Sequence, residues 1–418
     1  MTILISLLLS IVLYGQLGFN ASSYYFGLTN PSWPVWILLY ACTGWVAIKV
    51  LPKTRLYSFD LVFFVFILYL VLSFFVFGES SVDNFTNRLS IIIVMPYLCG
   101  RLLGQKENLS LVGSLKFMFA LYLLMISFEV LRNPALVTEM DRLRLFPIGG
   151  DISDQGVSTA YNIGLNFGSM WMVFFTLWYW KFGKKTADLR SHKLLGWLIV
   201  IPLLILILGS RSSLAALAVS AAFLGLRQKF SAKKIFRLLG LGIVFVGLGY
   251  FFIPESRMVL LHEAVFLPRL LGADDSVGQC VLSGDSITAR ATLLSEAFRL
   301  LGKAPFLGIG AGNFGLQYCG SPEELASPHS IFAQIMVDLG LSGLFIFGMM
   351  IWLLFRRFAD VIKIHAISDH HNLKIIFSLW LFVLVQIQIS GNIYYDYQFF
   401  LLTGLFAGVL QNAQRVEQ

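Results

Sequence analysis

Charged residues are scarce in this sequence. Only 13% of its 418 residues are Asp, Glu, Lys or Arg, whereas a soluble domain carries about 25%, so a water-soluble enzyme is excluded. Cysteine is also rare, with four residues, which excludes a small secreted scaffold held by disulfides. Hydrophobic residues make up 57% of the chain and the mean hydropathy is +0.77. This excludes a disordered chain and indicates a protein that crosses a membrane many times.

Long apolar segments recur along the chain. A helix needs about 20 apolar residues to cross the bilayer, because its backbone N–H and C=O groups must pair within the segment. About twelve segments meet this requirement, and they lie at residues 2–18, 34–51, 58–77, 88–104, 110–131, 157–180, 193–209, 212–227, 235–253, 329–356, 373–391 and 395–411. The first lacks a basic n-region and a cleavage site, so we expect a retained helix rather than a signal peptide. The expected fold is an all-α polytopic membrane protein.

The net charge of +8 is interpreted as a topology signal and not as a sign of nucleic acid binding. With both termini in the cytoplasm, the inner side receives 21 of the 31 Lys and Arg residues, as the positive-inside rule favours. The ten basic residues on the outer side do not serve this purpose. They need another reason to be there.

One outer segment is much longer than the other connections. Residues 254–328 separate nine predicted spans in residues 1–253 from three in residues 329–418, all within one integral membrane domain. Loops longer than about 15 residues are usually functional or disordered. The stretch from Met258 to Leu271 is apolar enough to lie along the membrane surface.

The same outer segment is predicted to contain a helix that Asp285 or Ser286 caps and that ends near Leu301. One face of this helix is predicted to be apolar and to consist of Leu293, Leu294, Ala297, Phe298 and Leu301. Cys280 and Cys319 also lie in the segment, where an oxidising compartment would permit a disulfide; a disulfide and two free thiols are both open. No residue spacing indicates a metal site.

Four outer arginines are candidates for binding phosphate. Arg211 lies at the tip of a predicted helix hairpin, where a guanidinium can bind phosphate through two hydrogen bonds. The alternative is an arginine that only anchors the helix end at the interface. Arg290 lies on the predicted outer helix, where the alternative is a solvated helix face. Arg142 and Arg144, flanked by Leu and Phe, are possible contacts to a lipid phosphate.

Glycines gather in the stretch Pro305–Gly315, which includes Gly308 and Gly310. A dinucleotide-binding loop would need a preceding strand and a following helix, and neither is evident. We interpret the stretch as a tight turn in which glycine allows the backbone to approach another group closely.

His329 is the one histidine placed where an outer loop enters a predicted span. Ser327 is expected to cap this helix and Pro328 to occupy its first position. His329 would then lie in the first turn, where the helix dipole disfavours the imidazolium ion and keeps the ring available as a base.

The order of these features resembles the O-antigen ligase and polymerase superfamily of bacterial inner-membrane proteins. The resemblance covers about residues 200–350, and the matching residues are Arg211, Arg290, Gly308, Gly310, His329, Gly340, Gly343 and Leu344. Ser330 departs from the pattern, because the family often has Asn after the histidine.

The resemblance implies a membrane glycosyltransferase of GT-C type that acts on the periplasmic side of the inner membrane. Its donor would be a glycan on undecaprenyl diphosphate, and transfer would invert the anomeric carbon without nucleotide, metal or cofactor. Arg211 and Arg290 would bind the diphosphate, and His329 would take the proton of the acceptor hydroxyl.

Three activities remain open for this sequence. A ligase transfers glycan to the lipid A-core, and a polymerase joins lipid-linked repeat units; the single dominant outer segment after the ninth span favours the ligase. A secondary transporter or flippase is the third reading, for which Asp338 in the tenth span is the clearest intramembrane acid. Transporters usually carry such residues in repeated halves, and the first half offers no match.

Overall fold

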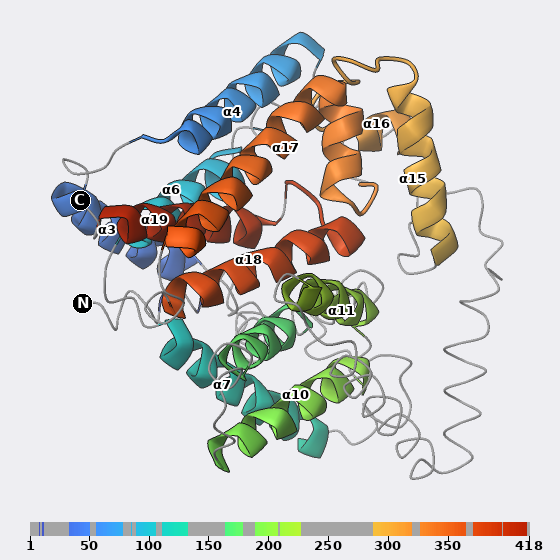
Figure 1. Cartoon of the computed structure of the whole chain (residues 1–418). Helices are drawn as coiled ribbons and strands as arrows, with labels where there is room; N and C mark the ends of the chain where they lie inside the picture. The colour runs from blue at the N-terminus through green and yellow to red at the C-terminus, as the bar shows by residue number, and fades with distance from the viewer. Residues whose placement is uncertain are drawn as a thin grey trace, which may run out of the picture. The chain divides into compact units, whose positions relative to one another are not determined.

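The computed structural model describes residues 33–50, 56–77, 89–105, 111–132, 164–178, 189–207, 210–226, 287–319, 327–364, 371–394 and 396–415, and the single residues 8, 11 and 85. These residues form helices and a few turns, and no strand occurs among them (Figure 1). The expectation of an all-α protein is confirmed. The chain divides into two compact units, one of residues 1–120 and 290–418 and the other of residues 121–289.

The helices of the first unit surround a common apolar core. They are α3 (Trp33–Val50), α4 (Ser58–Phe77), the π-helix η2 (Leu89–Val94), α6 (Met95–Leu103), α16 (Phe314–Cys319), α17 (Ile331–Ile364), α18 (His371–Ser390) and α19 (Tyr397–Arg415). The second unit contains a helix over residues 164–178, α10 (Leu189–Ile207) and α11 (Arg211–Leu226). Two further helices, α7 (Leu111–Arg132) and α15 (Ile287–Leu301), extend across the division between the units.

Three of the described helices are long and apolar enough to cross a membrane, namely Ser58–Phe77, Ile331–Ile362 and Asn372–Ile389. Shorter apolar helices occur at Ile37–Val46, Leu89–Leu103, Phe119–Phe128, Gly196–Ile205 and Ser212–Leu224. The predicted spans 2–18 and 235–253 lie outside the described residues, apart from Leu8 and Ile11. The protein is therefore a helical membrane protein, while the number of twelve spans remains a prediction.

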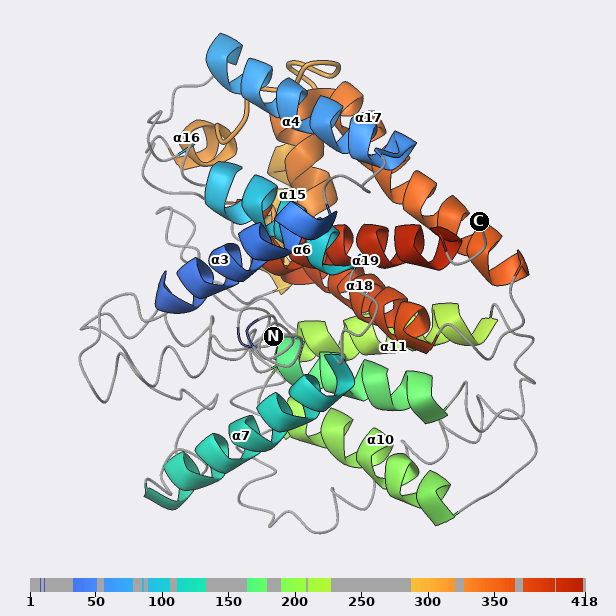
Figure 2. The same ribbon diagram turned by 90° about the vertical axis from the view of Figure 1, so that its left-hand side faces the viewer.

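Glycines let α6 and α19 pack with their backbones in contact, and both views place these helices side by side (Figure 1 and Figure 2). Gly404 and Gly408 of α19, and Gly100 of α6 with Gly104 that caps its end, are each four residues apart, so that the small residues form a row on one face. A Cβ atom added to Gly404 would lie 2.0 Å from the carbonyl oxygen of Tyr97, and one added to Gly104 would lie 2.4 Å from that of Leu405. Small residues with this spacing are typical of close helix pairs in membranes.

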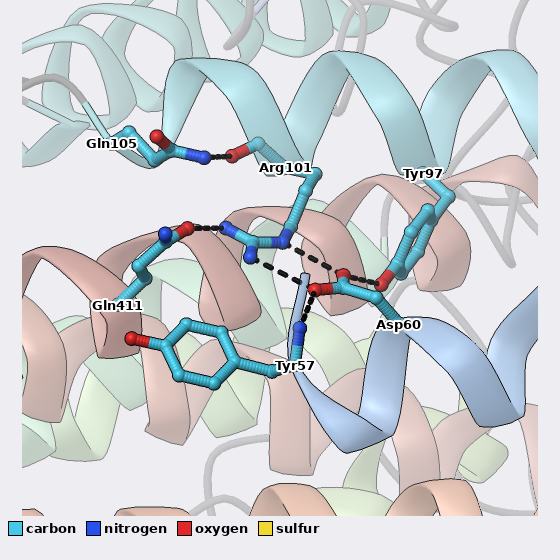
Figure 3. Close-up of polar contacts among 6 residues, drawn as sticks. All are labelled: Tyr57, Asp60, Tyr97, Arg101, Gln105 and Gln411. Atoms are coloured by element: carbon cyan, nitrogen blue, oxygen red, sulfur yellow. Dashed lines mark hydrogen bonds and ion pairs between the residues drawn. The ribbon is translucent and has the colours of Figure 1, made fainter. Parts of the chain in front are cut away.

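A buried ion pair joins α4 and α6 next to this contact (Figure 3). Asp60 and Arg101 are 2% and 4% exposed. The Arg101 guanidinium donates from Nε to Asp60 Oδ1 (2.8 Å) and from Nη2 to Asp60 Oδ2 (3.0 Å). The phenol of Tyr97 and the backbone N–H of Tyr57 also donate to the carboxylate. The third Arg101 nitrogen, Nη1, donates to the side-chain oxygen of Gln411 of α19. A buried charge is costly unless it is paired in this way, so the network ties three helices together.

Candidate active site

The helix α17 is broken at Gly340, whose φ of 70° and ψ of −172° are not helical. At such a break, backbone carbonyl groups on one side and N–H groups on the other lose their partners within the helix. The turn that follows α15 supplies new partners on both sides. These hydrogen bonds run from Ile309 N–H to Val337 C=O (2.9 Å), from Gly310 N–H to Asp338 C=O (3.0 Å) and from Leu341 N–H to Pro305 C=O (2.9 Å). Tyr69 of α4 donates to the carbonyl of Leu339 (3.1 Å).

Two glycines face each other where the turn meets the break. A Cβ atom on Gly308 would lie 2.4 Å from the carbonyl oxygen of Asp338, and one on Gly340 would lie 2.3 Å from that of Phe306. Both glycines also have a positive φ, which other residues adopt only at a cost. The prediction of a tight glycine turn that approaches another group closely is confirmed, and that group is the backbone of α17.

Asp338 fastens this glycine turn, here residues 304–313, from inside the protein. Its side chain is 1% exposed, and Oδ2 accepts hydrogen bonds from Gly312 N–H (3.1 Å) and from the Tyr394 hydroxyl (3.1 Å). Asn313 adds a further tie, since its side-chain nitrogen donates to the carbonyl of Phe77 at the end of α4 (2.6 Å). One carboxylate thus links the turn, α17 and the connection between α18 and α19.

The expected position of His329 is corrected by the structure. Helix α17 begins at Ile331, and its capping residue is Ser330, whose hydroxyl accepts from Ala333 N–H (3.4 Å) and whose carbonyl accepts from Gln334 N–H (2.9 Å). Ser327 is not the cap; its hydroxyl accepts from the backbone N–H of His329 (3.3 Å). His329 therefore precedes the helix instead of lying in its first turn, because its φ of +53° is incompatible with a helix.

A glutamine of α18 holds the start of α17, and sequence reasoning did not identify it. The side-chain oxygen of Gln388 accepts from the backbone N–H of Phe332 (3.1 Å) and from the hydroxyl of Ser330 (3.3 Å). Its nitrogen donates to the carbonyl of Leu384 (3.2 Å). The only signal in the sequence is a polar side chain within an apolar span. Gln388 thus fixes the backbone next to His329 from a helix that lies 56 residues further along the chain.

The helix that carries Arg290 is present, but its buried face differs from the prediction. Helix α15 covers Ile287–Leu301, close to the expected limits. Leu293, Ala297 and Leu300 are buried, whereas Leu294 and Phe298 are 38% and 56% exposed. The predicted apolar set therefore spans two faces of the helix, and only one of them packs against the protein.

The remaining candidate residues are located by the helix or the unit to which they belong. Arg290 and His329 belong to the first unit, and Arg211, the first residue of α11, belongs to the second. Arg142, Arg144 and Cys280 lie outside the described residues, as does the stretch from Met258 to Leu271. The disulfide between Cys280 and Cys319 remains a prediction. Within the described part of the chain, no group of three His, Cys, Asp or Glu residues could hold a metal ion.

Comparison with known proteins agrees with the resemblance seen in the sequence. The family model described as O-antigen ligase matches residues 194–348, which include α11, α15, the glycine turn, His329 and the break in α17. Among curated proteins, none matches the chain. Over residues 194–348 the chain is therefore similar to the O-antigen ligase family.

Proposed function

We propose that this protein is an O-antigen ligase that transfers a glycan from undecaprenyl diphosphate to the lipid A-core. One observation carries the proposal. The family-matched glycine turn, which follows the helix of Arg290, is hydrogen-bonded across the break in α17, the helix that follows His329. These hydrogen bonds hold the helix that carries Arg290 and the helix that follows His329 against each other.

The proposed reaction needs a base and a site for the leaving group. The acceptor hydroxyl attacks the anomeric carbon, the carbon–oxygen bond to the diphosphate breaks, and the configuration inverts. His329 accepts the hydroxyl proton, a role worth about 10²–10⁴ in rate. Arg211 and Arg290 bind the departing diphosphate, with charge-assisted hydrogen bonds of about 1.5–3 kcal/mol each. No nucleotide, metal or cofactor takes part in these steps.

The backbone of His329 supports its assignment as the base. A residue other than glycine in the left-handed region costs about 1–2 kcal/mol, and such residues persist where the surroundings impose the conformation, often at active sites. Ser327 on one side, and Ser330 with Gln388 on the other, impose it here. The backbone position of His329 is thus fixed by these side-chain hydrogen bonds and not by the hydrogen bonds of the helix.

The proposed location is the inner membrane of a bacterium, with both termini in the cytoplasm and the site on the periplasmic side. A polyprenyl tail remains in the lipid while its diphosphate meets the outer segment, so the reaction belongs at the interface. The ligase is preferred to a polymerase because the family model is described as a ligase and one outer segment, residues 254–328, dominates the predicted topology.

The test is transfer by the purified protein in nanodiscs, with undecaprenyl-diphosphate glycan and lipid A-core and without nucleotide or divalent metal. Glycan on the lipid A-core is the expected product, and His329→Ala should abolish it while the folded protein remains abundant. Longer glycan that stays on the lipid carrier would instead establish a polymerase. An intact donor with folded protein would contradict both activities.

A further inference from the structure

An apolar strip on α15 and the glycine turn is not covered by the part of the chain that the structure describes. Leu294 and Phe298 lie one helical turn apart on the same row of α15, and they are 38% and 56% exposed. The strip continues beyond the helix with Phe306 and Leu307, which are 69% and 51% exposed. On a flanking row of α15, Leu293, Ala297 and Leu300 are at most 1% exposed and pack inward.

A polar row runs along the other side of α15 from this strip. Arg299 pairs with Glu296 through Nε and Oε2 at 2.8 Å, and the Arg299 side chain is 57% exposed. The hydrogen bond from Arg299 lowers the pKa of Glu296 below its ordinary value, so this pair remains charged in water at neutral pH. Lys303 follows four residues after Arg299 and is also exposed. An apolar face with a basic polar face on the other side is typical of helices that lie on a membrane surface.

The depth of the strip is fixed by the contact with α17. The turn is hydrogen-bonded to the residues just after the break, with Leu341 N–H donating to Pro305 C=O (2.9 Å) and Ser342 N–H donating to Phe306 C=O (3.3 Å). The apolar stretch after the break, from Leu341 to Phe355, covers about 22 Å at 1.5 Å per residue, and Arg356 and Arg357 follow it. The hydrocarbon core is about 30 Å thick, so the break and the turn lie in the outer part of that core, within about 8 Å of its boundary.

Residues 333–340 of α17 are buried, and the helix becomes exposed again just after the break. A row of apolar side chains with helical spacing faces outward after the break: Leu341 (43% exposed), Phe345 (70%), Met349 (39%) and Trp352 (53%). In a spanning helix such a row faces the acyl chains of the lipid. The backbone of Phe306 is hydrogen-bonded to Ser342, in the first turn of this part of α17. The apolar strip is therefore connected directly to the lipid-facing row of α17.

We propose that α15 and the glycine turn lie on the outer leaflet of the bilayer, with Leu294, Phe298, Phe306 and Leu307 inserted among phospholipid acyl chains. Arg299 and Lys303 then lie among the headgroups and the water beyond them. Position 290 is one turn before Leu294, and on the proposed function this places Arg290 at the depth of a lipid-linked diphosphate. The membrane contact itself does not depend on the transfer reaction.

The test measures depth with a nitroxide label on single cysteines, in nanodiscs of phosphatidylethanolamine and phosphatidylglycerol, after replacement of the four native cysteines by serine. Collisions with oxygen report lipid, and collisions with a water-soluble nickel chelate report water. We expect Phe298→Cys and Phe306→Cys to favour oxygen, as Phe345→Cys on α17 does. Arg299→Cys and Lys303→Cys, the matched controls on the polar row, should favour nickel.

Two results would overturn the proposal. Equal access of nickel to positions 298, 306, 299 and 303 would place the strip in water. Protection of positions 298 and 306 from both reagents would show a protein partner on this face. A second measurement leaves the native cysteines in place: with benzoylphenylalanine at position 306, irradiation should yield adducts with phospholipid and not with protein. Neither measurement uses donor or acceptor glycan, so failure of the proposed transfer reaction would leave both readouts intact.

Discussion

Replacing Asp60 by leucine would leave the Arg101 guanidinium as an uncompensated charge inside the first unit. Two hydrogen bonds of 2.8 and 3.0 Å would be lost from Arg101, and the phenol of Tyr97 and the N–H of Tyr57 would lose their acceptor. Removal of one partner of a buried pair costs about 3–5 kcal/mol, a change of more than a hundredfold in the ratio of folded to unfolded protein. Arg101→Leu should cost a similar amount for the opposite reason.

The double variant decides whether the two effects are coupled. With both charges gone, no unpaired ion remains. The double variant Asp60→Leu/Arg101→Leu should therefore lose much less unfolding free energy than the two single variants lose together. The free energy of unfolding is measured by titration with dodecyl sulfate in mixed micelles. Glu296 and Arg299 form the control pair, with a matching distance of 2.8 Å but on the surface, where pairs contribute little. A coupling for Asp60 and Arg101 no larger than that of the control would refute the reasoning.

Three further predictions concern the backbone around the candidate site. His329→Gly and His329→Ala should both lose transfer, but the glycine variant should be more stable by about 1 kcal/mol because φ is positive at this position; equal unfolding free energies would contradict the imposed conformation. Gly340→Ala should destabilise the protein, since its Cβ atom would lie 2.3 Å from the carbonyl oxygen of Phe306, whereas Gly348→Ala in the same helix meets nothing within 4 Å and should be neutral or stabilising by about 0.5–1 kcal/mol. Gln388→Leu should lower the kcat of transfer more than it changes KM, and Gln388→Glu, which keeps an acceptor oxygen, should retain more activity; an equal loss in both variants would remove Gln388 from the positioning of His329.

Local signals in the sequence predicted local structure well. The helix over Ile287–Leu301 was expected within one or two residues at its start, because a capping residue and a 3.6-residue apolar period act over a few residues only. The close approach of the glycine turn was also expected. Its partner was not, because Gly308 and Gly340 meet through folding and a single glycine in an apolar helix is usually tolerated.

The errors at His329 and on α15 have the same origin. Ser327 and Ser330 are equally good capping residues, and the choice between them follows from the positive φ of His329 and from the contact with Gln388 of another helix. The burial of Leu293 but not of Leu294 depends on which side of α15 meets the protein. Tertiary partners decide these points, and a pattern within one segment cannot identify them.

The buried pair in Figure 3 also constrains the order in which the protein is made. Asp60 precedes Arg101 by 41 residues and Gln411 follows Arg101 by 310. The chain is synthesised at about 5–20 residues per second, so Arg101 follows Asp60 after some 2–8 s. The complete network can form only some 15–60 s later, when Gln411 has been added. Asp60 is therefore synthesised before its counter-ion. Asp60 lies in the first turn of α4, where its carboxylate can remain in contact with water at the membrane interface until Arg101 of α6 pairs with it.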